Sequence, residues 1–225
     1  MQYEVLTYGE SAFLIKFENE ISVEIHLQVK SLYLQLKNIH LVGVISLIPA
    51  YNSLTVIFDD QLIDGTFLKL FLEKTKFKKE GVEMAEKTIE IPVCYEKPYA
   101  LDLQEVSEKL NLTPSEIIAL HTSKTYLVYM LGFAPGFMYL GGLDTRLFIP
   151  RKDTPRLKVA AGSVGLADQQ TGVYPLETPG GWQIIGKTPI PLFSKKKSAL
   201  VSMGDRVKFV SITAEEYLKM ECTWQ

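Results

Sequence analysis

Hydrophobic positions in the first third of the chain follow two periodicities. One set has the spacing of a buried helix face and follows Ser22, a candidate N-cap; its members are Ile25, Val29, Leu32 and Leu36. Apolar residues also alternate with a period of two over positions 21–29, as in a strand. We predict a helix here, with a strand as the alternative.

Four apolar segments and a second helix complete the expected first domain. Strands are predicted at residues 3–7, 12–17, 41–47 and 54–58. Asp64 is the expected cap of the second helix, whose inward residues should be Phe67, Leu68, Phe71 and Leu72. This order indicates a small α+β domain at residues 1–86, with two helices on one antiparallel sheet and a charged linker at 76–86.

The pattern changes after residue 86. A strand is expected at 88–95, followed by two short helices. Thr113 and Glu116 form a capping box for the second, with Pro114 at its first position, and this helix should end near His121. Eleven of the fifteen glycines and seven of the eleven prolines lie beyond residue 125. They separate short strand-like runs at 126–131, 162–167, 182–185, 200–202 and 206–210, so we predict a β-barrel or sandwich at residues 87–225.

Composition and charge argue against several classes of protein. The 24 basic residues are scattered and the net charge is −2, so no nucleic-acid binding is predicted. The longest apolar stretch, 41–50, is about half of the ~20 residues that span a bilayer. No signal peptide is recognisable at the start, and Cys94 and Cys222 match no metal or redox spacing. We expect a cytoplasmic protein with two free thiols.

Two segments resemble catalytic motifs but lack their context. Residues 181–188 satisfy the letters of a phosphate-binding loop, yet their interior is bulky and strand-forming, and Pro189 and Pro191 exclude the helix that must follow. Ser163 resembles a nucleophile elbow, but Ala161 stands where that motif has glycine. We therefore expect a strand in the first segment and a turn or strand hydroxyl in the second.

The three histidines, His26, His40 and His121, share no motif, so no metal site is predicted. His121 is the functional candidate, since it lies at a predicted helix end beside the glycine-rich block. The alternative for each histidine is a structural role.

Two arginines in proline-stiffened segments, Arg151 and Arg156, mark the candidate site. A guanidinium group binds carboxylate or phosphate through two parallel hydrogen bonds. The alternative is structural pairing with Asp144, Asp153 or Glu177. Because rigid loops reduce stability unless they shape something, we predict that they form a cleft for a small acid. Its other residues would be Phe133, Pro135, Phe137, Tyr139, Ser163, Gln170, Thr171, Tyr174 and Trp182.

Five motifs in this order carry a family resemblance: GFAPGFMYL at 132–140, TPR at 154–156, AGSVG at 161–165, QTGVYP at 170–175 and PGGW at 179–182. The set resembles the family that contains the B subunit of 5-oxoprolinase (PxpB), the kinase inhibitor KipI and domains once labelled allophanate hydrolase subunit 1. Segments 8–12 and 49–54 extend the likeness to nearly the whole chain.

The resemblance implies a small α+β domain followed by a cyclophilin-like β-barrel. It also implies a protein that, with the 5-oxoprolinase subunits A and C, opens 5-oxoproline to L-glutamate using ATP and is inactive alone. ATP, with magnesium, would be used by the complex and is not expected to bind this chain by itself. His121, Arg151 and Arg156 would bind substrate and stabilise developing charge, and the surrounding residues would shape the pocket.

The alternative is a KipI-like inhibitor that grips a sensor histidine kinase through the aromatic loop 133–139. Peptidyl-prolyl isomerisation and a urea or allophanate amidohydrolase role have less support. The chain departs from the family pattern at three places: Asp168-Gln169 replaces Gly-Gly, Ala160 replaces Pro, and Lys187 replaces Arg. The first departure adds two side chains to a loop that is usually bare.

Overall fold

The computed structural model describes residues 2–75, 87–194 and 198–224. The chain divides into two compact units, Met1–Met84 and Ala85–Gln225, and each is described by itself. The predicted linker at 76–86, and with it the predicted boundary at residue 86, lies outside the described residues.

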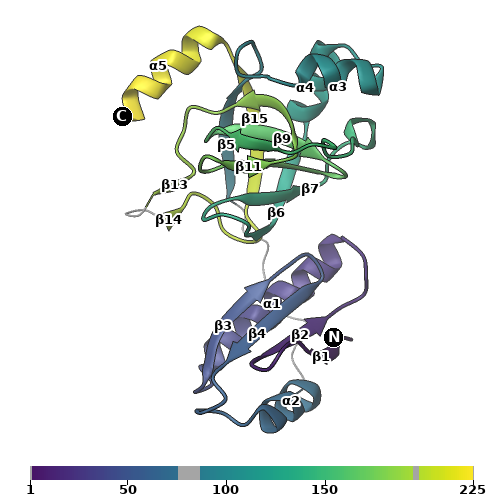
Figure 1. The fold of residues 1–225 in the computed structure, drawn as a ribbon, viewed down its shortest axis with the longest axis vertical. Helices are drawn as coiled ribbons and strands as arrows, with labels where there is room; N and C mark the ends of the chain where they lie inside the picture. Colours follow the sequence, from purple (N-terminus) through teal and green to yellow (C-terminus); the bar gives the residue numbers. More distant parts are fainter. Residues whose placement is uncertain (1, 76–86, 195–197, 225) are drawn as a thin grey trace. The chain divides into compact units, whose positions relative to one another are not determined.

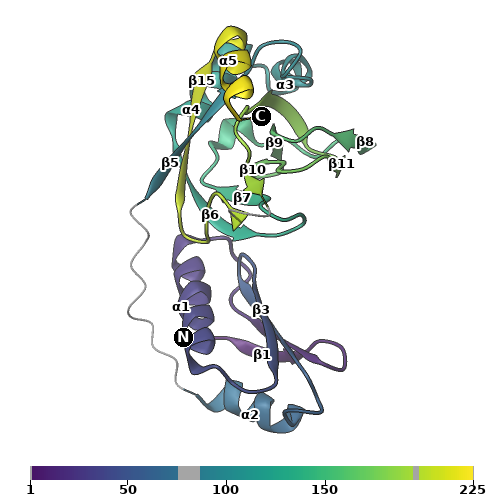
Figure 2. The same ribbon diagram turned by 90° about the vertical axis from the view of Figure 1, so that its left-hand side faces the viewer.

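Unit 1 is a four-stranded antiparallel sheet with two helices on one face (Figures 1 and 2). The strands run in the order β1-β2-β4-β3, with bounds β1 Glu4–Thr7, β2 Ala12–Lys16, β3 Val44–Pro49 and β4 Ser53–Phe58. Every second residue of β2 and β4 is buried. Both α1 (Val23–Ile39) and α2 (Gly65–Lys74) contribute apolar side chains to that same core.

The local signals for both helices are confirmed. The Ser22 hydroxyl accepts a hydrogen bond from Ile25 N at 3.3 Å, and the Asp64 carboxylate accepts one from Phe67 N at 2.8 Å. The prediction that Phe67 faces inward is wrong. Its side chain is 57% exposed because Leu68 and Leu72 define the buried face of α2.

Unit 2 contains a closed seven-stranded barrel, visible in Figure 1. Its strand order is β10-β7-β6-β15-β5-β12-β9, and β9 pairs with β10 to close it. The barrel pairs are antiparallel except β15 with β5. The bounds are β5 Thr88–Cys94, β6 Thr125–Leu131, β7 Met138–Gly141, β9 Ser163–Ala167, β10 Gln170–Val173, β12 Gln183–Lys187 and β15 Arg206–Ile212.

Further elements surround the barrel. They are α3 Leu103–Leu110, α4 Pro114–Ser123, η1 Thr145–Leu147, the pair β8 Arg156–Val159 and β11 Thr178–Gly180, the pair β13 Phe193–Ser194 and β14 Ser198–Ala199, and α5 Ala214–Trp224. In Figure 2, β8 and β11 project as an arm from the barrel strands. The capping box of α4 is confirmed, since Thr113 Oγ1 accepts from Glu116 N and Glu116 Oε2 accepts from Thr113 N.

Unit 2 confirms one further prediction, contradicts another and contains one helix that was not predicted. The phosphate-loop lookalike is a strand, β12, as expected. The strand predicted at 200–202 is wrong, because Ser202 N donates to the Asp205 carboxylate in a turn before β15. Helix α5 was not predicted; its Tyr217 is 1% exposed.

An antiparallel sheet with two helices and a closed barrel confirm the coarse fold prediction. The cyclophilin-like character of the barrel stays a prediction. Among the helices the structure describes, none combines the length and apolar character needed to cross a bilayer.

Candidate functional site

Aromatic side chains form a cluster on the outside of the barrel. Strand residues alternate between the two faces of a sheet, so Met138 and Leu140 point into the barrel core and Tyr139 points out. Tyr139 belongs with four other rings, and we call this set the aromatic cluster: Phe133, Phe137, Tyr139, Tyr174 and Trp182.

Phe137 is at the centre of the aromatic cluster. Its ring centroid lies 4.8 Å from that of Tyr139, 5.2 Å from Tyr174 and 5.4 Å from Trp182. The ring planes meet at 60–88°, the edge-to-face arrangement that aromatic pairs prefer. The cluster is therefore a packed, shaped surface.

Two glycines of the barrel wall allow the rings to approach. A Cβ atom on Gly172 would lie 2.7 Å from Met138 O and 3.0 Å from Trp182 Cζ3. A Cβ atom on Gly165 would lie 3.0 Å from Trp182 Cβ. The glycines of the QTG and AGSVG motifs thus seat Trp182 against the barrel.

The loop before β7 presents Phe133 to solvent. Phe133 is 64% exposed and adopts a left-handed backbone conformation, with φ of 69°. A non-glycine residue at positive φ is uncommon, and here it turns an aromatic ring outward. Pro135 beside it is also exposed, and Gly136 at φ of 84° completes the turn.

Arg151 places a positive charge beside the aromatic cluster. Its side chain is 59% exposed, and Nε donates to Asp168 Oδ2 at 3.3 Å. Burial raises the pKa of both Tyr139 and Tyr174, and the Arg151 guanidinium acts in the opposite direction on each. The two side chains are both more than half exposed, so this pair lies at the surface of unit 2.

Arg156 is held in a partly buried ion pair. Nη1 and Nη2 donate to the two oxygens of Asp102, at 2.8 and 2.5 Å, and Asp102 is 2% exposed. Arg156 lies opposite Gly180 in the pair of β8 with β11, two residues from Trp182. Its charge therefore lies close to the aromatic cluster but is already neutralised, by a carboxylate that we did not anticipate.

Asp102 joins several segments of unit 2. Its carboxylate also accepts from Ile184 N at 2.7 Å and from Lys152 Nζ at 3.2 Å. Lys152 Nζ donates further to Glu105 at 2.7 Å. Asp102 precedes α3 and reads in sequence as an ordinary helix-start residue, so its partners 54 and 82 positions away carry no local signal.

His121 lies inside the barrel, apart from the arginines. Its ring is fully buried and stacks on Phe209, with centroids 4.5 Å apart. Nδ1 contacts the Tyr95 hydroxyl at 2.7 Å, and Nε2 contacts Thr171 Oγ1 at 2.8 Å. Burial lowers the pKa of His121 to about 3. The imidazole is therefore neutral at physiological pH.

The hydrogen bonds identify the tautomer of His121. The single hydroxyl proton of Thr171 is donated to Gly165 O at 3.1 Å. Thr171 Oγ1 must then accept from Nε2–H of His121, which leaves Nδ1 to accept from the Tyr95 hydroxyl. In this arrangement His121 and Thr171 are linked to each other and have no contact with solvent.

The structure thus brings part of the predicted set together. Arg151, Arg156, Pro135 and the aromatic cluster lie on one outer face, with Gln170 half-buried at the start of β10. Ser163 is 3% exposed on β9, and His121 and Thr171 belong to the interior. The catalytic role of Arg151 stays a prediction, whereas the contacts of Arg156 and His121 position other groups.

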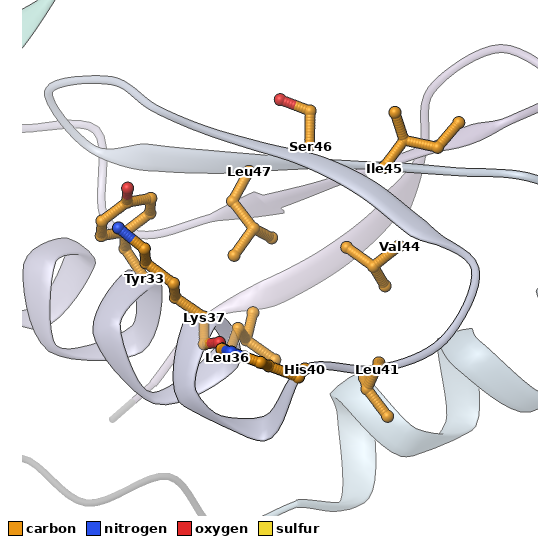
Figure 3. Close-up of a pocket in the computed structure, with 9 residues that line it drawn as sticks. All are labelled: Tyr33, Leu36, Lys37, His40, Leu41, Val44, Ile45, Ser46 and Leu47. Carbon is orange, nitrogen blue, oxygen red and sulfur yellow. The ribbon is translucent and has the colours of Figure 1, made fainter.

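A separate groove lies in unit 1, between the C-terminal half of α1 and strand β3 (Figure 3). Its volume is about 520 Å³, and Lys37 Nζ lies 5.7 Å from the Tyr33 ring centroid at its edge. None of the predicted site residues lines it. In the described part of the chain, no group of His, Cys, Asp or Glu is arranged to hold a metal ion.

Comparison with known proteins gives consistent matches. The family model for the carboxyltransferase domain, subdomains C and D, matches residues 3–203. The chain is 41% identical over 230 residues to the 5-oxoprolinase B subunit of Bacillus subtilis (strain 168), with 96% of each protein covered.

Two solved structures share the fold. The crystal structure of TTHA0988 is similar with a TM-score of 0.79 and 32% identity, over 90% of this chain and 40% of that one. The K. lactis urea amidolyase is similar with a TM-score of 0.82 over 96% of this chain and 15% of that one. At 21% identity the second likeness shows the fold alone. The present chain spans less than half of either structure.

Proposed function

The chain belongs to the family of carboxyltransferase-domain proteins, subdomains C and D, that contains the 5-oxoprolinase B subunit, and from this premise we propose that it is the B subunit of an ATP-dependent 5-oxoprolinase. The complex would open 5-oxoproline to L-glutamate in the cytoplasm, together with subunits A and C. The observation that carries the proposal is the 41% identity to a 5-oxoprolinase B subunit over 96% of both proteins.

The reaction requires activation of an unreactive lactam. Transfer of the γ-phosphoryl group of ATP to the lactam oxygen makes the ring carbon electrophilic. Water adds there, the C–N bond breaks to give γ-glutamyl phosphate, and a second water releases phosphate and L-glutamate. Fixed positive charge near the developing negative charge is the contribution a protein makes to such steps.

In this proposal Arg151 is the residue of this chain that meets the substrate. It is exposed, lies beside Tyr139 and Tyr174, and its pairing with Asp168 is between two solvent-exposed groups. Such pairs are weak, so a substrate carboxylate can compete for the guanidinium. Arg156 and His121 would support the site by holding β8, β12 and β10 in place.

The exposed Phe133 supports a partner protein at the same face. Large aromatic side chains are enriched at the centres of protein interfaces. Phe133 is the exposed ring of the aromatic cluster, with 64% of its surface accessible. A neighbouring polypeptide that covers Phe133 would close the substrate site against water. The chain alone would then be inactive, and ATP with magnesium would bind elsewhere in the complex.

Reconstitution tests this function. The chain is mixed with subunits A and C from the same source, ATP, magnesium and 5-oxoproline, and L-glutamate is measured with each component omitted in turn. We expect glutamate from the complete mixture and none when this chain is left out. A complete mixture that hydrolyses no 5-oxoproline would contradict the proposal.

A second candidate rests on the same exposed ring. Phe133 and the loop 133–139 are also suited to gripping a sensor histidine kinase, as an inhibitor of phosphotransfer. If this were the role, the chain would reduce autophosphorylation of a purified histidine kinase and Phe133→Ala would restore it. Full kinase activity at a saturating concentration of this protein would exclude the inhibitor role.

A further inference from the structure

A hollow of unit 2 lies between the end of β12, the turn before β9 and helix α5. Its volume is about 310 Å³, at the lower end of the ~300–1,000 Å³ typical of small-molecule sites. Its walls include Gly162, Lys187, Pro189, Leu192, Tyr217 and Glu221. It shares none of these residues with the aromatic cluster.

The walls of this hollow are held by the backbone. Thr188 N donates to Gly162 O at 2.9 Å, and Gly162 N donates to Tyr174 O at 2.7 Å. Gly162 has a φ of 83°, and a Cβ atom on it would lie 2.4 Å from Thr188 O. A side chain is therefore excluded here, and Pro189 stiffens the adjoining wall. The hollow is a preformed feature.

Two opposite charges face the hollow without meeting. Lys187 Nζ lies 5.8 Å from the ring centroid of Tyr217, and the Tyr217 hydroxyl donates to Glu221 Oε1 at 3.2 Å. Across the described residues, no salt bridge joins Lys187 or Glu221 to any group. Tyr217 itself is 1% exposed and contacts both charged side chains.

A ligand that fits must carry a carboxylate for Lys187 and an N–H donor for Glu221. The other walls, formed by Pro189, Leu192 and neighbouring apolar groups, favour a compact apolar body between the two. Simple anions satisfy one charge only and leave the Glu221 carboxylate facing a second negative group. An acid with nitrogen on the adjacent carbon satisfies both.

We propose that this hollow binds a small α-amino acid or its cyclic lactam, with the carboxylate on Lys187 and the adjacent N–H on Glu221. The shared chemistry admits 5-oxoproline and free amino acids such as L-proline, and these are separate arms of the test. The site is distinct from the one placed at Arg151, and its existence does not depend on the proposed function.

Binding to the isolated chain is followed by ¹H–¹⁵N NMR at the Gly162 and Thr188 amides, with 5-oxoproline, L-proline and cyclopentanecarboxylate at millimolar concentration. The third compound has the ring and carboxylate but no N–H. We expect saturable shift changes with at least one of the first two and about 10- to 100-fold weaker binding of the third, the ratio for a lost hydrogen bond to a charged group. No shift changes with either nitrogen compound, or equal binding of all three, would overturn the proposal.

Substitutions of Lys187 and Glu221 test the contribution of each charge to binding separately. Lys187→Gln should abolish binding, Lys187→Arg should retain it, and Glu221→Gln should remove the preference for the nitrogen compounds. Lys158→Gln and Glu215→Gln are the matched controls, since both residues are exposed and lie outside the hollow. Unchanged binding in Lys187→Gln would also overturn the site, whereas glutamate release by the reconstituted complex tests the proposed function separately.

Discussion

Arg151 and Arg156 lie five positions apart and have different surroundings in this structure. Arg156 forms two hydrogen bonds with a carboxylate that is 2% exposed, whereas Arg151 pairs with Asp168 where both side chains are more than half exposed. The contribution of an ion pair depends on its surroundings, since an exposed pair adds ~0–1 kcal/mol and removing one partner of a buried pair leaves an uncompensated charge.

This contrast predicts a split between stability and activity. Arg156→Gln should lower the free energy of unfolding of unit 2 by on the order of 2 kcal/mol, less than for a fully buried pair because Lys152 still faces Asp102. Arg151→Gln should change it by less than about 0.5 kcal/mol. Urea titrations followed by circular dichroism measure both.

The catalytic activity of the Arg151→Gln variant provides the other half of the comparison. In the reconstituted complex, Arg151→Gln should reduce kcat/KM for 5-oxoproline by about tenfold or more, the loss of one charged hydrogen bond. Equal activity of Arg151→Gln and the parent protein would remove Arg151 from the site.

His121 makes unit 2 sensitive to acid. Burial lowers its pKa from 6.5 to about 3 in the folded chain, so below pH ~6.5 the unfolded chain takes up a proton that the folded chain does not. The free energy of unfolding is therefore not reduced by protonation of His121 above pH ~6.5, and it falls progressively as the pH decreases from ~6.5 towards 3. His121→Gln should lose less of its free energy of unfolding between pH ~6.5 and ~4 than the parent does.

The tautomer can be measured directly. Long-range ¹H–¹⁵N correlation spectra should show His121 neutral and protonated at Nε2 near pH 6, as its bonds to Thr171 and Tyr95 require. An imidazolium signal for His121 at that pH would contradict the buried arrangement.

At the scale of elements, the barrel strands and the aromatic cluster depend on each other. Gly172 of β10 has Trp182 on one side and the Met138 carbonyl on the other. Gly172→Ala should therefore lower the stability of unit 2 by about 1–3 kcal/mol, as expected for overpacking. Gly132→Ala is the matched control, since the nearest atom to its Cβ would be Tyr139 Cε2 at 4.0 Å. A Gly172→Ala variant as stable as Gly132→Ala would show that Trp182 is not seated as described.

Elements were predictable where their signals are local. Ser22, Asp64 and Thr113 each cap a helix within three residues, so these helix starts follow from sequence. Helix α5 was missed although Thr213 and Glu216 form a capping box at its start, a signal that was available in the sequence. Its buried Tyr217 packs against Tyr99, 118 positions away, and that contact carries no local signal.

The sequence indicated several residues that the structure brings to one face, but not how they pair, and the predicted members His121, Ser163 and Thr171 are buried instead. Proline-flanked arginines and the glycine-rich motifs indicated one aromatic and cationic face, and the structure places most of them there. Asp102 could not be recognised, since its bonds to Arg156 and Ile184 cross 54 and 82 residues. His121 was a functional candidate because the sequence locates it at the end of a helix beside the glycine-rich block. The sequence does not show which way the side chain points.

At the scale of the whole molecule, we infer that this chain is one part of a larger assembly. It covers 96% of a 5-oxoprolinase B subunit and 40% of the TTHA0988 chain. Arg151 and Phe133 are exposed on one face of unit 2. We expect a partner to cover that face, and Phe133→Asp to weaken co-purification with the C subunit while leaving the thermal unfolding of the isolated chain unchanged.

The most direct test is a titration of this chain into fixed amounts of subunits A and C, with ATP, magnesium and 5-oxoproline present, while the initial rate of L-glutamate release is recorded. We expect a rate near zero without the chain, a rise as the chain is added, and a plateau at a fixed molar ratio to the C subunit. A rate that does not respond to the chain would contradict the proposed function.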